Sequence, residues 1–320
     1  MNLSAWSVTC LALSLLACDG NAVAVAGADE DRNEPAPAPI VLAGHVPSTP
    51  IAASAAAQAA PVTGGPQPAL RVPDPPFVST EVARFDQPWA MTFLPDGRLL
   101  VTEKPGRLRL LNPATGQSGE ITGVPAVAYG GQGGLGDVIL HPRFADNGLI
   151  YVSYAESGAN STRGAAVARA RLVIDAGANS GRLEGLQVIW RQVPKVTGDA
   201  HYSHRMLFDA QGKLWISSGE RQKASPAQDM QSNLGKILRL NDDGSVPADN
   251  PFVGRPNVRP EIFSWGHRNP QGLAMHPETG RMWECEHGPR GGDELNLLKA
   301  GSNYGWPRAT HGIDYSGAII

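Results

Sequence analysis

One short pattern recurs four times in this chain and limits the folds that it can adopt. Each copy has an apolar residue, a polar turn that contains glycine, and then an apolar run typical of a strand. The copies begin at Phe93, Leu140, Phe208 and Met275. A second strand-like run follows some copies, as at 106–111 and 236–240. Repeats roughly fifty to seventy residues long, each with room for four short strands, are typical of a β-propeller.

The repeat also predicts how the strands are packed. Each propeller blade buries its faces against its neighbours, so the ring must close to be stable. We therefore predict an all-β fold, a β-propeller of which about four blades are present. The sequence reaches Ile320 without a closing strand, which we interpret as a chain truncated at its C-terminus. A four-bladed ring is the alternative.

Composition supports this fold class and excludes one kind of partner. The 320 residues include 37 Gly and 27 Pro, so the chain has many turns, as short-strand proteins do. The formal net charge is −3, charged residues make up 18%, and no basic face is evident. We therefore expect no nucleic-acid partner.

The N-terminus has the features of a targeting segment. An apolar run at 8–17 precedes Cys18, and Leu-Leu-Ala-Cys resembles a bacterial lipobox. We predict a lipoprotein-type signal segment at 1–18, with export to the periplasm and a lipid anchor in a membrane. A plain secretory signal peptide cleaved within 22–26 is the alternative. The Ala- and Pro-rich stretch at 19–75 predicts a disordered tether, and the propeller domain then covers 76–320.

The cysteines exclude one kind of covalent stabilisation. Cys10 and Cys18 lie in the targeting segment, which leaves Cys285 alone in the mature domain. No intrachain disulfide can then form. We expect Cys285 to be a small buried apolar residue.

Ligands of propellers usually bind over the central channel, so we searched the loops for reactive side chains. Gln132 lies in a glycine-rich loop at 130–136, where the backbone can approach a ligand closely. His201 and His204 lie within one short segment, and a histidine can accept a proton from a hydroxyl. The alternatives are a flexible surface loop for the former and histidines packed in a turn for the latter. A zinc site here lacks a partner set of ligands.

Two further turns carry charged groups. Glu220 ends the third-copy strand and could orient a neighbouring imidazole, or else form a solvated pair with Arg221. Arg268 and Asn269 follow the apolar run at 262–265. Their guanidinium and amide suit an anionic, oxygen-rich ligand, although the turn could equally be a structural corner.

The region from 288 to 314 is rich in oxygen ligands. It contains Gly288-Pro289, Asp293-Glu294, an Asn-Tyr-Gly-Trp-Pro run at 303–307, and Asp314. Calcium binds carbonyl and carboxylate oxygens together. The alternative is a capped turn with solvated acids.

Taken in order, these motifs resemble the soluble pyrroloquinoline-quinone (PQQ) dependent sugar dehydrogenases, which include glucose, aldose-sugar and sorbosone dehydrogenases. The His-Arg-Asn-Pro-Gln-Gly run at 267–272 and the Asn-Tyr-Gly-Trp-Pro run carry the resemblance, which covers about residues 75 to 320. It implies a six-bladed propeller that uses PQQ and Ca²⁺ to oxidise an aldose at C1 to the lactone, with hydride transfer to PQQ.

The resemblance also implies a role for each site residue. His201 is implied as the general base on the C1 hydroxyl, Glu220 as the group that holds its imidazole, and Arg268 as the stabiliser of charge on the quinone oxygen. The remaining roles are contacts to PQQ by His201, Gln132, Arg268 and Asn269, a calcium on the carbonyls of Gly288 and Pro289, and a second calcium at Glu294, Tyr304 and Asp314, with Thr310 nearby.

The chain departs from the family pattern at three places. Ser203-His204 stands where members often have Gly-Ser, and Gly292-Asp293 replaces an acidic pair. Further cofactor-binding Lys and Arg residues of the family would follow Ile320. Two other functions stay open: a calcium-dependent propeller hydrolase of the lactonase type, and a non-catalytic sugar- or protein-binding propeller that has lost PQQ. The sequence does not identify the sugar, the electron acceptor or the oligomeric state.

Overall fold

The computed structural model describes residues 77–320. The predicted signal segment at 1–18 and the tether, which ends at 75, lie outside the described residues, and both stay predictions. Within 77–320, no helix is long and apolar enough to cross a membrane.

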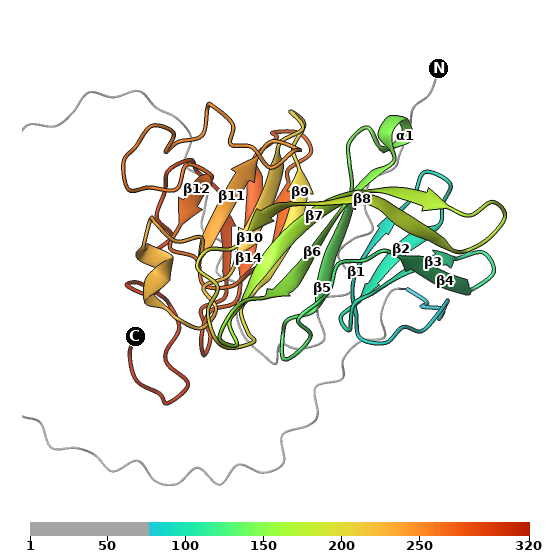
Figure 1. Cartoon of the computed structure of the whole chain (residues 1–320). Coiled ribbons are helices and arrows are strands. Elements are labelled where there is room, and N and C mark those ends of the chain that lie inside the picture. Colours follow the sequence, from blue (N-terminus) through green and yellow to red (C-terminus); the bar gives the residue numbers. More distant parts are fainter. Residues whose placement is uncertain (1–76) are drawn as a thin grey trace, which may run out of the picture. The chain divides into compact units, whose positions relative to one another are not determined.

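The first eight strands form two antiparallel units that share an edge (Figure 1). The first unit is β1 (Pro88–Phe93), β2 (Leu99–Glu103), β3 (Arg107–Asn112) and β4 (Gln117–Thr122). The second is β5 (Leu135–Leu140), β6 (Leu149–Ser157), β7 (Arg163–Ile174) and β8 (Gly181–Arg191), with the short helix α1 (Phe144–Asn147) between β5 and β6. The edge joins β4 to β8 in parallel through only two residue pairs, Ile121 with Gly181 and Thr122 with Arg182.

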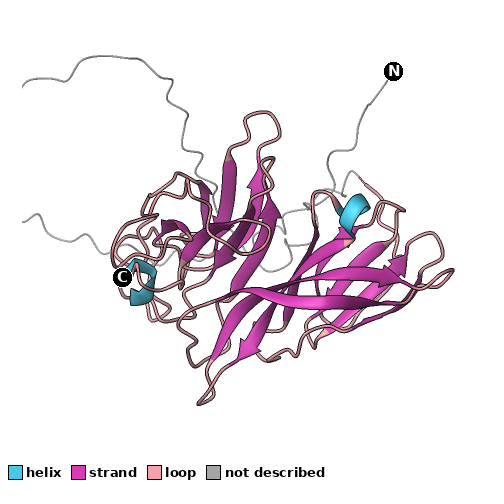
Figure 2. Ribbon diagram, turned by 45° about the horizontal axis from the view of Figure 1, so that its top comes forward, coloured by secondary structure: helices cyan, strands magenta, loops and turns pink. Residues whose placement is uncertain are grey.

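Two further antiparallel units follow. The third unit is β9 (Ser203–Phe208), β10 (Leu214–Ser218), β11 (Lys236–Leu240) and β12 (Ile262–Trp265), with a 3₁₀ turn at Ser225–Gln228. The fourth is β13 (Pro270–Met275), β14 (Met282–Glu286) and β15 (Glu294–Leu297). Figure 2 shows that the described residues consist almost entirely of strands and the loops between them. The first strands of successive units, β1, β5, β9 and β13, contact one another in that order. Antiparallel units arranged in this way are the blades of a β-propeller, and we call them blades from here on.

The repeated turn has one physical cause in all four blades. It joins the first strand to the second, and its glycine has a positive φ: 86° at Gly97, 65° at Gly148, 72° at Gly212 and 64° at Gly280. Side chains with a Cβ rarely adopt this conformation, so glycine is required there. The all-β propeller prediction is confirmed. The six-blade count stays a prediction.

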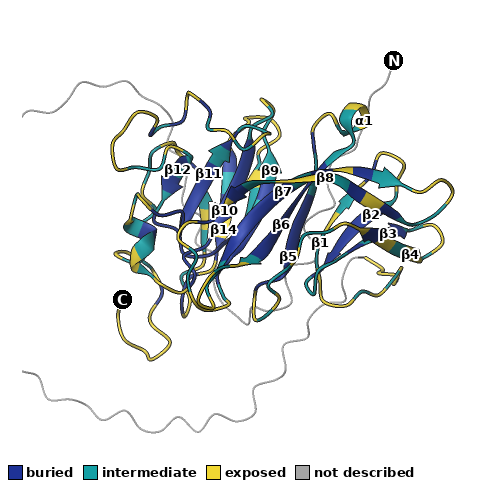
Figure 3. Ribbon diagram, viewed as in Figure 1, coloured by how far each residue is buried: buried dark blue, intermediate teal, exposed yellow. Residues whose placement is uncertain are grey.

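The core consists of layers between neighbouring blades, because successive strand residues face opposite sides. In β6, Ile150 and Val152 pack toward the first blade, whereas Tyr151 and Ala155 pack toward the third. A third layer lies between the third and fourth blades and includes Trp215 and Met282, among others. Figure 3 shows that the buried residues concentrate in the strands near the middle of the molecule.

The prediction that Cys285 is buried is wrong, because Cys285 is exposed in the structure. On β14, Glu284 and Glu286 face inward, and alternation then turns Cys285 to the opposite face. Two buried carboxylates therefore take the inward positions of this strand.

Candidate functional site

A cavity of about 240 Å³ lies where the first strands of the four blades begin. All four blades contribute to its lining. The residues come mainly from β1 in the first blade, the loop before β5 in the second, the start of β9 in the third and the start of β13 in the fourth. Its lining is rich in hydrogen-bond donors and aromatic rings and consists of Trp89, Lys104, Gln132, Tyr202, Ser203, His204, Asn269, Gln271 and His287. Gln132 and Asn269 were predicted as ligand-binding residues from two motifs more than a hundred residues apart, and the structure places both in the lining of this cavity.

His201 and Glu220 form a buried pair, and neither residue is among those that line this cavity. His201 is linked to the cavity through its neighbour Tyr202 and through Gln132, which accepts a hydrogen bond from its backbone N–H. Nδ1 of His201 lies 2.5 Å from Oε1 of Glu220. The other carboxylate oxygen accepts hydrogen bonds from the backbone N–H groups of Lys223 and Ala224. Because all three bonds are accepted by the carboxylate, the ionised form of Glu220 fits, and Nδ1 of His201 carries the shared proton. The second ring nitrogen of His201 is then a proton acceptor.

The backbone around this pair adopts an uncommon conformation. φ is 49° at His201, 57° at Ser203 and 50° at His204, and 62° at Arg221. Left-handed residues other than glycine cost roughly 1–3 kcal/mol each and persist only where the surroundings fix them. The hydroxyl of Ser203 donates to Oδ1 of Asn269 at 3.0 Å. The cost is met by burial and hydrogen bonds of this kind.

Gln132 connects the glycine-rich loop to the base. Its Oε1 accepts a hydrogen bond from the backbone N–H of His201 at 2.7 Å, which leaves its amide N–H₂ group for a ligand. The loop approaches its neighbours closely: a Cβ on Gly131 would lie 2.4 Å from the Asp199 carboxyl carbon. Glycine is therefore needed to bring Gln132 to this position.

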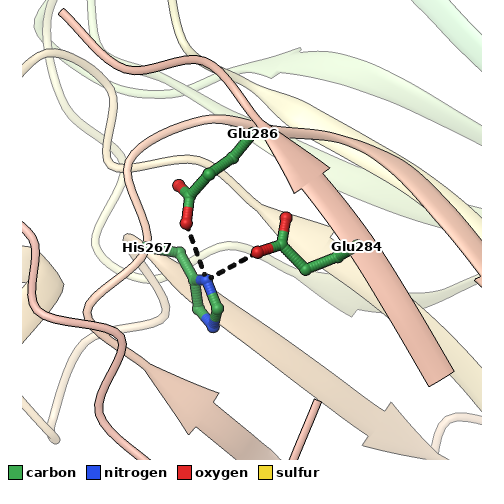
Figure 4. Close-up of side chains that lie close together, drawn as sticks. All are labelled: His267, Glu284 and Glu286. Atoms are coloured by element: carbon green, nitrogen blue, oxygen red, sulfur yellow. Dashed lines mark hydrogen bonds and ion pairs between the residues drawn. The ribbon is translucent and has the colours of Figure 1, made fainter. Parts of the chain in front are cut away.

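Glu286 organises the turn that carries Arg268 and Asn269. Its Oε2 accepts hydrogen bonds from the backbone N–H of Arg268 at 2.5 Å and of Asn269 at 3.2 Å. Its Oε1 contacts Nδ1 of His267 at 3.1 Å. Figure 4 shows both Glu286 and Glu284 directed at the same imidazole nitrogen. The buried Glu286 therefore fixes the direction of both candidate cofactor-binding residues.

His267, Glu284 and Glu286 are all buried, and one ligand atom from each lies within 4.8 Å of the others. Burial alone would lower the pKa of His267, but its hydrogen bonds to Glu284 and Glu286 outweigh this and raise its pKa to about 9. Burial raises the pKa of Glu284, and the bond to His267 opposes this. An imidazolium between two carboxylates explains the cluster without a metal ion.

Arg268 lies in the second, smaller cavity and not in the one that holds Gln132 and Asn269. Its Nη1 donates to the carbonyl of Gly288 at 2.6 Å and to that of His287 at 3.0 Å. The guanidinium therefore donates to the Gly288 carbonyl, one of the two carbonyls that the sequence suggested as calcium ligands. Its buried Nε–H group has no hydrogen-bond partner among the described residues.

The residues expected at a second calcium are spread over different surroundings. Glu294 is half-buried and accepts from Nδ2 of Asn296, and burial raises its pKa. The phenol of Tyr304 donates to the Leu297 carbonyl, and its ring stacks on His267. Asp314 is exposed and accepts from the backbone N–H of Ser316. Among the described residues, no hydrogen bond joins Asp314 to Glu294.

Six lining residues were given no role from the sequence: Trp89, Lys104, Tyr202, Ser203, Gln271 and His287. The last four are neighbours of motif residues, so proximity in sequence could have found them. Trp89 and Lys104 flank the first copy of the repeat and carry no local signal. Only the closure of one blade against the next brings them to the cavity.

With the geometry established, comparison with known proteins identifies the family. The model of the glucose / sorbosone dehydrogenase family matches residues 85–320. Aldose sugar dehydrogenase YliI of Escherichia coli is 44% identical over 249 residues, which are 77% of this chain and 66% of that protein. The chain thus spans just under two-thirds of the length of this relative.

Solved structures agree. One of a glucose dehydrogenase superposes with a TM-score of 0.71 and 49% identity, over 73% of this chain and 67% of that one. The PQQ-bound aldose sugar dehydrogenase of Streptomyces coelicolor superposes with a TM-score of 0.65 and 32% identity, over 76% of this chain and 69% of the other. The chain belongs to the glucose / sorbosone dehydrogenase family, whose named members here are sugar oxidoreductases. The resemblance drawn from the motifs is confirmed.

Proposed function

We propose that this protein oxidises an aldose at C1 to the lactone and uses PQQ as its electron acceptor. The observation that carries the proposal is the buried His201–Glu220 pair, whose backbone is hydrogen-bonded to Gln132 in a cavity lined by hydrogen-bond donors. Membership of the family and the PQQ-bound relative support it. The sugar, and the acceptor that reoxidises the cofactor, stay unassigned.

The base is His201. Since Glu220 accepts the Nδ1 proton, Nε2 of His201 is free to accept the proton of the C1 hydroxyl. Glu220 also holds the imidazole in one orientation, because its carboxylate is itself fixed by two backbone N–H groups. Loss of the hydroxyl proton makes the sugar a better hydride donor.

The cavity fits PQQ, which is a planar, anionic compound rich in acceptor oxygens. Trp89 and Tyr202 offer aromatic faces, whereas Gln132, Asn269 and Lys104 offer donors. Arg268 lies in the second, smaller cavity, and its buried Nε, which has no partner in the described residues, is a further donor for a ligand that reaches from one cavity to the other. When bound, PQQ supplies a quinone that accepts a hydride equivalent from C1. Arg268 would then stabilise negative charge near the cofactor.

Calcium is proposed at the carbonyls of Gly288 and Pro289, next to the cofactor. The small cavity there has the volume of about one water, roughly 10 Å³, and its lining includes the Gly288 backbone and the Glu294 carboxylate. A calcium ion on the Gly288 carbonyl would compete with the Arg268 guanidinium. We also propose a second calcium at Glu294, Tyr304 and Asp314, and export with a lipid anchor at Cys18.

The experiment is a titration of the purified full chain with PQQ in the presence of calcium, followed by addition of glucose or another aldose. We expect PQQ to bind, and the quinone absorbance to change when the sugar is added. A protein that binds PQQ without any change on addition of a panel of aldoses would contradict the proposed oxidation. Hydrolysis of a lactone without PQQ would support the hydrolase alternative instead.

A further inference from the structure

His204 is a second imidazole at the cavity, and the proposed function gives it no role. Its residue is 1% exposed, and its ring stacks on that of Trp89, with the centroids 5.2 Å apart and the planes 18° apart. A Cβ on Gly136 would lie 1.9 Å from Cε1 of His204, so only glycine at 136 leaves room for this ring. The second blade therefore leaves room for the His204 imidazole only because residue 136 has no side chain.

The hydrogen bonds of Ser153 fix which ring nitrogen of His204 carries the proton. Oγ of Ser153 accepts from the backbone N–H of Asp137 at 2.8 Å and lies 2.7 Å from Nδ1 of His204. Among the described residues, Nδ1 is the one acceptor within reach of the Ser153 hydroxyl proton. Satisfying that buried hydroxyl makes Nδ1 the acceptor, and the proton of the imidazole is then on Nε2.

The imidazole stays neutral at physiological pH. Burial, and to a smaller extent the charge of Arg205, lowers the pKa of His204 to about 3. His201 and His204 therefore have opposite tautomers: the former offers an acceptor at Nε2, and the latter a donor.

Nε2 of His204 makes no hydrogen bond to the described residues, and it is not one of their fully enclosed unpaired atoms. Since His204 lines the cavity, this donor faces its interior. None of the described residues that line the cavity is acidic, whereas Lys104, Gln132, Gln271 and His204 all offer N–H groups. Such a lining favours a ligand with acceptor oxygens and negative charge over a neutral polyol.

We propose that His204 is a cofactor-binding residue, whose neutral Nε2–H group donates a hydrogen bond to an acceptor oxygen of PQQ. This inference rests on the proposed function and adds a contact that the family resemblance does not supply.

Two amide variants of the full chain test the proposal, because each amide mimics one imidazole nitrogen. In His204→Asn, the side-chain oxygen can still accept from Ser153, but no donor reaches the cavity. In His204→Gln, the longer side chain can place its N–H₂ group near the position of Nε2. We expect the Asn variant to bind PQQ roughly tenfold more weakly, and the Gln variant to bind within about threefold of the natural chain.

His204→Phe is a third variant. It keeps the stack on Trp89 and removes both nitrogens, so we expect the same loss as in Asn, and it decides the question if the Asn variant does not fold. Because His204 stays neutral, the loss should be equal across about pH 5–8.

Provided that the natural chain binds PQQ, three results would overturn the inference. The first is an unchanged PQQ affinity in both the Asn and the Phe variant, and the second is an equally weakened PQQ affinity in the Gln, Asn and Phe variants. The third is a raised KM for the sugar with an unchanged PQQ affinity. A natural chain that binds no PQQ would instead contradict the proposed function.

Discussion

The two sides of the candidate site differ in how completely their polar groups are paired. On the base side, His201, Glu220, Gln132 and Asn269 each have a hydrogen bond within the protein, and none of the fully buried unpaired atoms of residues 77–320 belongs to them. On the side of the loop that begins at His287, pairing is incomplete. Four buried side-chain polar atoms in residues 77–320 lack a partner, and three of them lie on this side: Nε of Arg268, Oε2 of Glu284 and Nε1 of Trp306.

This difference separates a preorganised region from one that needs a ligand. Buried polar groups are nearly always hydrogen-bonded, so orphan groups around one loop indicate a missing partner. The base side holds its proton acceptor in place without help, as catalysis by preorganised groups requires. We infer that the protein alone orients the His201 imidazole, whereas the proposed calcium and PQQ supply the partners that Arg268 and the adjoining loop lack.

The largest effect is expected from a substitution on the base side of the site. His201→Gln in the full chain should lower kcat by roughly two to four orders of magnitude, the usual range for loss of a general base. PQQ binding should largely survive, because Gln132, Arg268 and Asn269, the residues proposed to contact the cofactor, are unchanged. The measurement is steady-state oxidation together with a PQQ titration.

The matched comparison is His204→Gln, which changes an imidazole three residues away. It is assayed at saturating PQQ, because we propose that His204 contacts the cofactor, and there it should keep most of the turnover. An inactive His204 variant beside an active His201 variant would show that the base is wrongly assigned. Full turnover in both would exclude the proposed dehydrogenase mechanism.

Removal of calcium tests the side of the loop. A ligand that binds only the folded state stabilises it, by about 2.7 kcal/mol at one hundred times its dissociation constant. We therefore expect a chelator to lower the thermal midpoint, and added calcium to restore it. Scanning calorimetry with and without excess chelator measures this. An identical midpoint in both would remove the ion from the site.

A smaller effect is expected from His267. Its folded-state pKa of about 9 is raised above the ordinary value, so its contribution to stability is complete below about pH 6.5. That contribution is lost as the pH rises through about 9. Urea unfolding should show a free energy of unfolding that falls over this window, and His267→Gln should flatten the fall. An equal slope in both proteins would assign the pH dependence to other groups.

The smallest effect is expected at the N-terminus. Because the Ala- and Pro-rich residues before 75 suggest a tether, deletion of residues 1–74 should leave kcat and KM unchanged. The assay compares the deleted and full chains at equal PQQ loading. Loss of turnover in a soluble, folded product of the deletion would give this segment a role in the site.

Much of the fold could be predicted from local pattern, because one left-handed glycine per blade fixes the same turn. The strands at 236–240 and 262–265 are those of β11 and β12. The contact of Glu220 with His201 also followed from the family motifs. These features depend on residues close in sequence or on a shared motif.

The rest depends on approach between blades. Trp89 and Lys104 reach the cavity from the first blade, and nothing in their own segments marks them. The hydrogen bond from Arg268 to the Gly288 carbonyl could not be predicted from the sequence. The long side chain of an arginine can point toward either cavity, and the sequence does not say which. The outward position of Cys285 follows from the two inward glutamates beside it, which composition alone did not weigh.

The central claim is that the His201–Glu220 pair promotes removal of hydrogen from C1 of an aldose. Its most direct test is the rate at which glucose changes the quinone absorbance of the PQQ-loaded chain in one turnover without oxygen. We predict slower reduction with deuterium at C1, an unchanged rate with deuterium at C2, and a lactone as the product. Equal rates for glucose with and without deuterium at C1, together with a product other than the lactone, would contradict the claim.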